Sequence, residues 1–423
     1  MPQKQKVAIG LAAIAVMVIL AVTAYLWSTD RLKIGAAANI TVSPAQLLLT
    51  VDQVAPVQVT GGNLPYGGFA SSSPDVAIVD SFYSYSASDV EPMLSLVVKA
   101  ISPTADSATI KVWDDSGSAV ELPVVVSASL ADINQTAKFT NSNLKVNLGE
   151  QCDATLESTN GDVWTSNIIS DPSIATVTRV GAANIDNAVK TSLRVYGAKV
   201  GTNTITVKNK NGADAQLSVE VVRSGGTCAN VQSDLGTPQL TSNVVFAPGS
   251  TPPLLVGQML AVRVTADKLS GYLIDKPDVV AVDSWHDVNS TGNVTDLTLR
   301  AVGAGTANLY VWNQQGEVSE YPLTVSALGE VNTQAKFNPK SATVKVGEQA
   351  DLIVDLAQGQ PSQWVSIIAG DNAIAPPVRF GTVQNNNQAK VALRVLGVKV
   401  GATSYILIHK DGSLAKVNIL VSQ

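Results

Sequence analysis

Apolar and polar side chains alternate along short stretches through most of this chain. Clear cases are the runs at 94–100, 108–113, 204–208, 215–222 and 307–312. Gly, Asn, Asp and Pro residues separate these runs. Alternation with a period of two predicts short antiparallel strands, and no stretch after residue 34 keeps a helical period. The pattern therefore predicts an all-β chain that is built from sandwich domains.

The first 34 residues follow a different pattern. Residues 7–27 carry no charged side chain, and as a helix they would span about 31 Å, close to the thickness of a bilayer core. We predict a transmembrane helix, with the residues after 34 on the extracellular or periplasmic side. A helix packed inside a protein assembly and a cleaved signal peptide are the two alternatives. The membrane or assembly contacts are assigned to Val7, Ile9, Leu11, Ile14, Val18, Leu20, Tyr25 and Trp27.

The remainder of the chain repeats itself in an alternating order. The string NQTAKF at 134–139 returns as NTQAKF at 332–337, and PDVAIVDSF at 74–82 returns as PDVVAVDSW at 277–285. These pairs are interleaved, so a two-module unit has been duplicated once, in the order A, B, A′, B′. Because A meets B and A′ meets B′ through short junctions, we expect each of these pairs to form a semi-rigid rod.

The repeat predicts the domain boundaries directly. The N-terminal helix and its flanks occupy 1–34, module A 39–128, module B 129–223, a linker rich in Gly and small polar residues 224–237, module A′ 238–327, and module B′ 328–423.

Composition narrows the classes of function. Charged residues make up 15% of the chain, and its net charge is −6. A nucleic-acid partner would need clustered Lys and Arg, so none is expected. The sequence contains no nucleophile elbow, zinc motif, phosphate loop or EF-hand loop. We therefore expect no enzymatic activity, no metal and no cofactor, and we interpret His286 and His409 as ordinary surface histidines.

Certain strings resemble a known family of modules. The matching segments are SSPDVAIV, SDPSIATV and KPDVVAV, together with VKVGEQADL and VGAGTANLYVW. They are similar to bacterial immunoglobulin-like (Ig-like) modules of the group 2 type, found in surface proteins such as intimin and invasin. The resemblance covers about residues 39–423 and implies four tandem β-sandwiches, exported to act as spacers, adhesins or structural parts. Its motifs encode strands and turns rather than a ligand site.

The two cysteines lie where the repeat is broken. Cys152 stands in GEQCD, whose counterpart GEQAD has Ala350, and Cys228 stands in the linker. Each is present in one half only, as expected for a bonded pair, so we predict a disulfide and an oxidising compartment. The alternative is two independent buried thiols.

An aromatic cluster in module A is also absent from module A′. It consists of Tyr66, Phe69, Tyr83 and Tyr85, which stand among Gly and Ser residues. Aromatic residues on such loops favour protein or glycan contacts, so we predict a contact site here. The alternative is that these side chains fill the sandwich core. Glycosylation sequons occur at Asn39, Asn134, Asn289 and Asn293.

Three functions remain compatible with the sequence. The preferred one is a non-enzymatic, membrane-anchored surface protein, a structural or adhesive rod that contacts copies of itself or other surface proteins. The second is a self-assembling subunit of an extracellular filament, pilus or virion, with its apolar helix in the assembly core or in a membrane. The third is a glycan-binding protein.

Overall fold

The computed structural model describes most of the chain after residue 39. The described residues are 40–62, 66–87, 90–103, 107–127, 138–157, 164–185, 188–209, 214–231, 240–241, 243–249, 253–267, 269–287, 293–328, 336–355, 364–385, 388–410 and 413–423. All regular elements in these ranges are β-strands, so the all-β prediction is confirmed. No helix with the length and hydrophobicity to span a membrane lies in the described part of the chain. The predicted N-terminal helix lies outside it.

The first two modules each contribute eight strands. Module A contains β1 (Ile40–Ser43), β2 (Leu47–Thr50), β3 (Val54–Gly61), β4 (Tyr66–Ser71), β5 (Ala77–Ala87), β6 (Val90–Ala100), β7 (Ala108–Asp114) and β8 (Ala119–Ser127). Module B contains β9 (Lys138–Phe139), β10 (Asn143–Asn147), β11 (Gln151–Glu157), β12 (Trp164–Ile169), β13 (Ala175–Ile185), β14 (Ala188–Gly197), β15 (Gly201–Asn209) and β16 (Asp214–Val222).

The second two modules repeat this order of strands. Module A′ contains β17 (Val245–Ala247), β18 (Leu254–Leu255), β19 (Met259–Thr265), β20 (Leu269–Ile274), β21 (Val280–Asp287), β22 (Val294–Ala301), β23 (Gly305–Asn313) and β24 (Val318–Ser326). Module B′ contains β25 (Lys336–Asn338), β26 (Ser341–Lys345), β27 (Gln349–Asp355), β28 (Trp364–Ala369), β29 (Pro377–Asn385), β30 (Gln388–Leu396), β31 (Gly401–His409) and β32 (Leu414–Ser422).

The alternating side chains form these strands as expected. Along β8, for example, Leu122, Val124 and Val126 are buried while the residues between them face outward. Each module places its strands in two facing layers, such as β1-β3-β6-β5 and β2-β8-β7-β4 in module A. Buried alternate residues of the two layers meet in the middle, as in Ig-like sandwiches.

The modules do not pair in the order of the chain. The four sheets have eight strands each, and every sheet combines half a sandwich from each of two modules. Modules A and B′ share two sheets, and modules B and A′ share the other two. The expectation that A pairs with B and A′ with B′ is therefore wrong. We call the A–B′ pair the outer body and the B–A′ pair the inner body.

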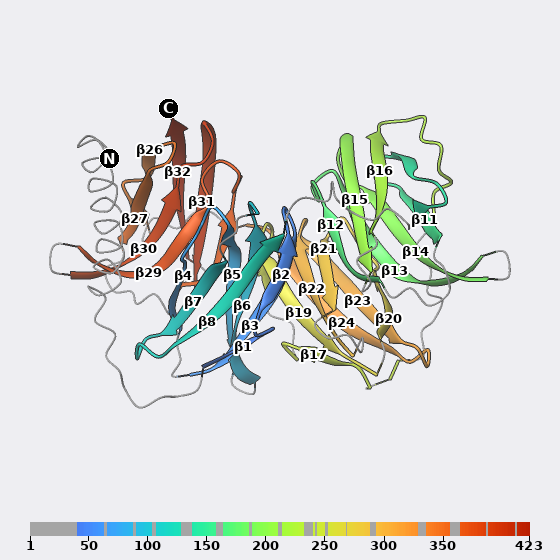
Figure 1. Ribbon diagram of the computed structural model, residues 1–423, viewed down its shortest axis with the longest axis horizontal. Coiled ribbons are helices and arrows are strands. Elements are labelled where there is room, and N and C mark those ends of the chain that lie inside the picture. Colours follow the sequence, from blue (N-terminus) through green and yellow to red (C-terminus); the bar gives the residue numbers. More distant parts are fainter. Residues whose placement is uncertain are drawn as a thin grey trace, which may run out of the picture.

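The lengths of the connections explain this order. Edge strands of two neighbouring modules pair after one module has turned back beside the other, and a long connection gives room for this turn. The longest connection, residues 223–244, joins B to A′, whereas only residues 128–137 join A to B and 327–335 join A′ to B′. The outer body is thus built from the first and last modules of the chain, and the inner body from the two middle modules. In Figure 1, A and A′ meet in the middle, and B′ and B lie at the two ends.

Candidate functional site

The candidate site is the joint between paired modules, where the edge strands of two sandwiches meet. In the outer body, β4 pairs antiparallel with β29, and Phe69 lies opposite Phe380. On the other layer β5 pairs with β28, and Tyr83 lies opposite Ser366. The inner body repeats both pairings, β20 with β13 and β21 with β12. Edge pairing of this kind joins two sheets through main-chain hydrogen bonds.

Glycines allow the two backbones of each joint to approach closely. A Cβ atom on Gly271 would overlap the carbonyl oxygen of Val180 and would lie 2.5 Å from the Trp312 ring. Gly68, the corresponding residue of the outer body, has the same relation to Phe380 and Trp113. Any side chain at these positions would force the modules apart.

An arginine from the B-type module covers each of these tryptophans. Arg179 lies over the ring of Trp312 at 5.6 Å, and Arg379 lies over Trp113 at 5.7 Å. Such cation–π contacts stabilise by about 0.5–2 kcal/mol. These glycine and arginine residues were not among the predicted site residues. The repeat in the sequence could have identified them. Gly68 aligns with Gly271, and each of the two arginines stands two residues before a glycine.

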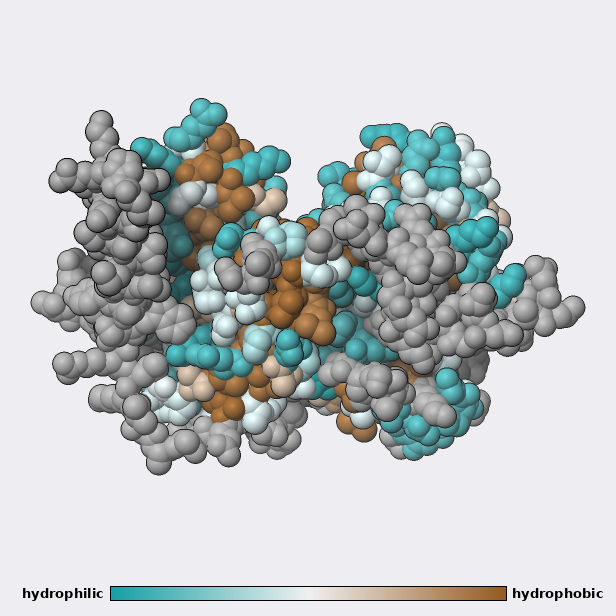
Figure 2. Space-filling model, viewed as in Figure 1, coloured by the Kyte–Doolittle hydropathy of each residue, from teal (hydrophilic) through white to brown (hydrophobic). Residues whose placement is uncertain are grey.

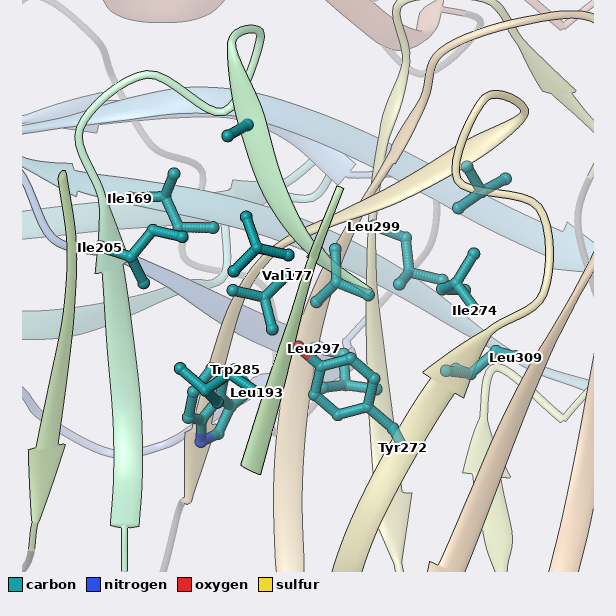
Figure 3. Packing of buried hydrophobic residues seen from close by; sticks show 14 of the residues in the cluster. Ile169, Val177, Leu193, Ile205, Tyr272, Ile274, Trp285, Leu297, Leu299 and Leu309 are labelled. Carbon is teal, nitrogen blue, oxygen red and sulfur yellow. The ribbon is translucent and has the colours of Figure 1, made fainter. Parts of the chain in front are cut away.

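The joints also make the hydrophobic cores continuous between modules. One buried cluster combines residues of A and B′, and a second combines residues of B and A′ together with Tyr83 of A. Figure 3 shows the second, in which Val177 and Leu193 of B lie near Leu297 of A′. Each body therefore has one core that spans two sandwiches, so neither module of a pair can leave without exposing apolar surface.

The aromatic cluster of module A lies inside the molecule. Tyr66, Phe69 and Tyr83 are 6%, 1% and 7% exposed and stand on β4 and β5 rather than on loops. Phe69 packs against Phe380 of B′ with ring centroids 6.2 Å apart. For these three residues the predicted exposed contact site does not hold. Tyr66 and Phe69 belong to the buried core shared by A and B′, and Tyr83 packs into the core of the inner body, where its hydroxyl donates to the Pro253 carbonyl at 3.4 Å. The side chain of Tyr85 lies outside the described part of the structure.

A polar layer separates the outer body from the inner body. The Ala261 N–H donates to Ser95 Oγ at 3.1 Å, and Gln58 Nε2 donates to the Ala247 carbonyl at 2.9 Å. Arg263 donates to Ser43 Oγ at 2.8 Å and forms an ion pair with Asp296. Sheets β1-β3-β6-β5 and β17-β19-β22-β21 thus face each other through serine, glutamine and charged groups. Although Tyr83 of A packs into the inner core, the contact between bodies is more polar than the contact within each body.

Several carboxyl groups in and beside this layer have raised pKa values. Burial raises the pKa of Asp283, and the ion pair with Arg300 opposes this effect. Burial likewise raises the pKa of Asp80, which accepts a hydrogen bond from Asn372 Nδ2 of B′ at 2.5 Å. The pKa of Asp287 is raised to about 6, mainly by burial. Burial thus favours the protonated form of all three carboxyl groups, and Asp80 is the one of them whose hydrogen bond joins two modules.

The two histidines lie in strands rather than in surface loops. His409 on β31 is buried, with its ring centroid 5.3 Å from that of Trp364. His286 on β21 lies opposite Ser166 in the inner joint, and burial lowers its pKa. Among the described residues no group of His, Cys, Asp and Glu is arranged to hold a metal ion.

The predicted disulfide is present. The Cys152 and Cys228 sulfur atoms are bonded, with Cα atoms 5.8 Å apart. The bond fastens the start of the B–A′ connection to β11, and the Val231 N–H donates to the Gln151 carbonyl beside it at 3.0 Å. We expected this link to stiffen a joint between two rods. Instead it holds the connection that closes the inner body.

The other predicted site residues fall mostly outside the described ranges. This is true of Val7 to Trp27 and of the sequons at Asn39, Asn134 and Asn289. Asn293 is half-buried just before β22, and its carbonyl accepts a hydrogen bond from the Ala266 N–H.

Comparison with known proteins yields structural similarity only. No protein-family model matches the chain, and no curated protein matches it. Similar solved structures include the N-terminal eight Ig domains of Down syndrome cell adhesion molecule, at 12% identity and a TM-score of 0.16 over 92% of this chain. Domains 4–9 of the surface layer protein SbsC match at 15% identity and a TM-score of 0.17 over 91% of this chain. Invasin, a bacterial integrin-binding protein, matches at 11% identity and a TM-score of 0.19 over 91% of this chain.

The matched lengths differ among these structures. The chain spans 55% of the cell adhesion structure, 65% of the surface layer structure and 79% of invasin. At these identities and TM-scores the similarity does not extend to function. The strand order and the joints define the chain as a protein of four tandem Ig-like modules, paired across its two halves.

Gly271→Ala should disrupt the inner joint. The added methyl group meets the Val180 backbone and the Trp312 ring, so we expect a loss of about 1–3 kcal/mol or more in the free energy of unfolding, measured by urea titration. Gly249→Ala is the matched control, because its Cβ would meet nothing closer than 3.7 Å. Equal stability of the two variants would contradict the close approach.

Asp287 should make stability depend on pH. Its folded pKa of about 6 exceeds its ordinary value of 3.8, so its ionisation costs stability above pH 6 and this cost is relieved as pH falls. Between pH 7 and pH 4 the wild type should gain up to about 3 kcal/mol relative to Asp287→Asn. His286 titrates in both proteins and cancels in the difference. The stability of both proteins is measured by urea titration at each pH. Parallel profiles for wild type and Asp287→Asn would show that the pKa of Asp287 is not raised.

Proposed function

We propose that this chain is a non-enzymatic structural or adhesive protein of a cell or particle surface, attached by its N-terminal apolar segment. The observation that carries the proposal is the cross-pairing of the modules. Two bodies with continuous cores make a stiff block whose sheets are paired at the internal edges. Such a block suits bearing load or presenting surfaces at a fixed spacing, whereas flexible tandem modules would not.

Two further features support an exported location. The disulfide between Cys152 and Cys228 indicates an oxidising compartment. The uncharged segment at 7–27 is long enough to cross a bilayer. With that segment in a membrane, the spacer at 35–38 would keep module A close to the bilayer and the modules would form an exposed layer above it.

The self-assembling subunit is the second candidate function. In this candidate the same block of modules is a subunit of a larger assembly. Its apolar segment then lies either in the core of that assembly or in a membrane. The observation that favours contact between copies is the exposure of apolar turns at the ends of B and B′, where Leu148 of B and Val346 of B′ are 44% and 47% exposed.

Vesicle flotation distinguishes attachment from assembly. Full-length protein, reconstituted by removing detergent in the presence of lipid vesicles, should float with them, and the chain lacking residues 1–34 should stay in the dense fraction. This follows because the apolar segment supplies nearly all of the transfer energy into lipid. Ordered lipid-free polymers of the full-length protein, seen by electron microscopy, would instead select the self-assembling subunit. Flotation of both proteins would contradict attachment through residues 1–34.

A further inference from the structure

One tight turn occurs at the same place in all four modules. It links the second and third strands and has a residue with positive φ, namely Asp52, Gly149, Gly257 and Gly347 (65°, 80°, 94° and 84°). The N–H of this residue donates to a carbonyl on or just after the sixth strand, as from Gly257 to Ala301 at 2.8 Å and from Gly347 to Gly397 at 2.8 Å. Because the backbone is the same, differences among the four turns come from their side chains and surroundings.

In modules A and A′ this turn is docked on the other body. Gln53 and Gln258, which follow the positive-φ residue, are only 3% and 2% exposed. Gln53 Nε2 donates to Ser166 Oγ on β12 of module B at 3.5 Å. The turn of A′ lies against β28 of module B′, where a Cβ atom on Gly257 would be 2.9 Å from Ile368. Each A-type turn therefore rests on a strand of a B-type module.

In modules B and B′ the same turn is exposed and apolar. Leu148 and Val346, which precede the positive-φ glycine, are 44% and 47% exposed. The neighbouring connection adds Val200 in B at 44%, and Val398 and Val400 in B′ at 44% and 51%. Glutamates replace the two buried glutamines. An exposed apolar turn at the position that is docked elsewhere in the chain indicates a contact that the described part of the chain does not complete.

Both exposed turns lie on one side of the molecule. The Leu148 N–H donates to the Val222 carbonyl at the end of β16, and the Val346 N–H donates to the Ser422 carbonyl at the end of β32. Figure 1 shows β16 and β32 ending on the same side, at the top of the view. In Figure 2, brown apolar surface is visible on module B′ toward that side.

We propose that the exposed turns of B and B′ dock on Ig-like modules of a second copy of this chain. The occupant is inferred from the chain itself, because the equivalent turns of A and A′ already rest on such modules. The duplicated fold also presents two matching turns on one face, which fits a partner with the same two-fold arrangement. The proposal deepens the second candidate function, on which it rests, by assigning the contact between copies to these turns, and it does not require the membrane segment.

The test uses full-length protein in detergent micelles, followed by sedimentation velocity over a range of concentrations. Wild-type protein should associate. The triple variant, with Leu148→Glu, Val346→Glu and Val400→Glu, should have a dissociation constant about tenfold higher or more, because charges would enter an apolar contact. The control is Val245→Glu on β17, which is 61% exposed and lies at the bottom of Figure 1. It should associate as wild type does. Thermal unfolding confirms that each variant is folded.

Three results would overturn the proposal. Wild-type protein that stays monomeric at every concentration would show that the turns do not bind a second copy. Equal weakening by Val245→Glu would show a general effect of charge rather than a contact at the turns. Unchanged association in the triple variant would show that the turns are not the contact between copies. If the same three substitutions removed binding of the chain lacking residues 1–34 to phosphatidylcholine vesicles, the turns would be assigned to a bilayer. Flotation of full-length protein tests membrane attachment, and sedimentation tests contact between copies. Failure of one proposal can therefore be told from failure of the other.

Discussion

Pairing of edge strands between modules is the contact on which the rest of this structure depends. An Ig-like sandwich leaves unpaired strands at the edges of both sheets, and these edges are a liability in an isolated domain. Here the β4–β29 and β20–β13 pairings continue the sheets from one module into the next. Gly68 and Gly271 permit the approach, and the cores merge behind it. The burial of Phe69, the position of Trp312 and the order of the modules all follow from these pairings.

The two kinds of contact have different physical characters. Within a body, apolar burial and strand pairing hold two modules together. Between bodies, the contact is a layer of hydrogen bonds such as the one that Arg263 of A′ donates to Ser43 Oγ of A, and burial raises the pKa of Asp283 and Asp80 beside it. Polar contacts of this kind contribute less net stability than apolar burial. The interface between bodies is therefore the weaker one, although the short connections at 128–137 and 327–335 keep the bodies close.

The sequence predicted the elements of the fold better than their arrangement. Period-two alternation located strands such as β7 and β16, and the break in the repeat identified the Cys152–Cys228 bond. Pairing between modules has no local signal, because an edge strand and a central strand can show the same alternation. For this reason Tyr66 and Tyr83, set among Gly and Ser, resembled an exposed surface although they are covered by another module. The glycines opposite Trp113 and Trp312 carried the missing information.

The most direct test of the cross-pairing is formation of engineered disulfides in full-length protein. Ala70 of A is the register partner of Arg379 of B′, and adjacent antiparallel strands place Cα atoms about 4.5–5.5 Å apart, within disulfide range. Ala70→Cys with Arg379→Cys should form an intramolecular bond under mild oxidation. Ala70→Cys with Arg179→Cys, the equivalent position of B, should not. A bond in the second variant and none in the first, by mass spectrometry, would mean that A pairs with B and would contradict the account.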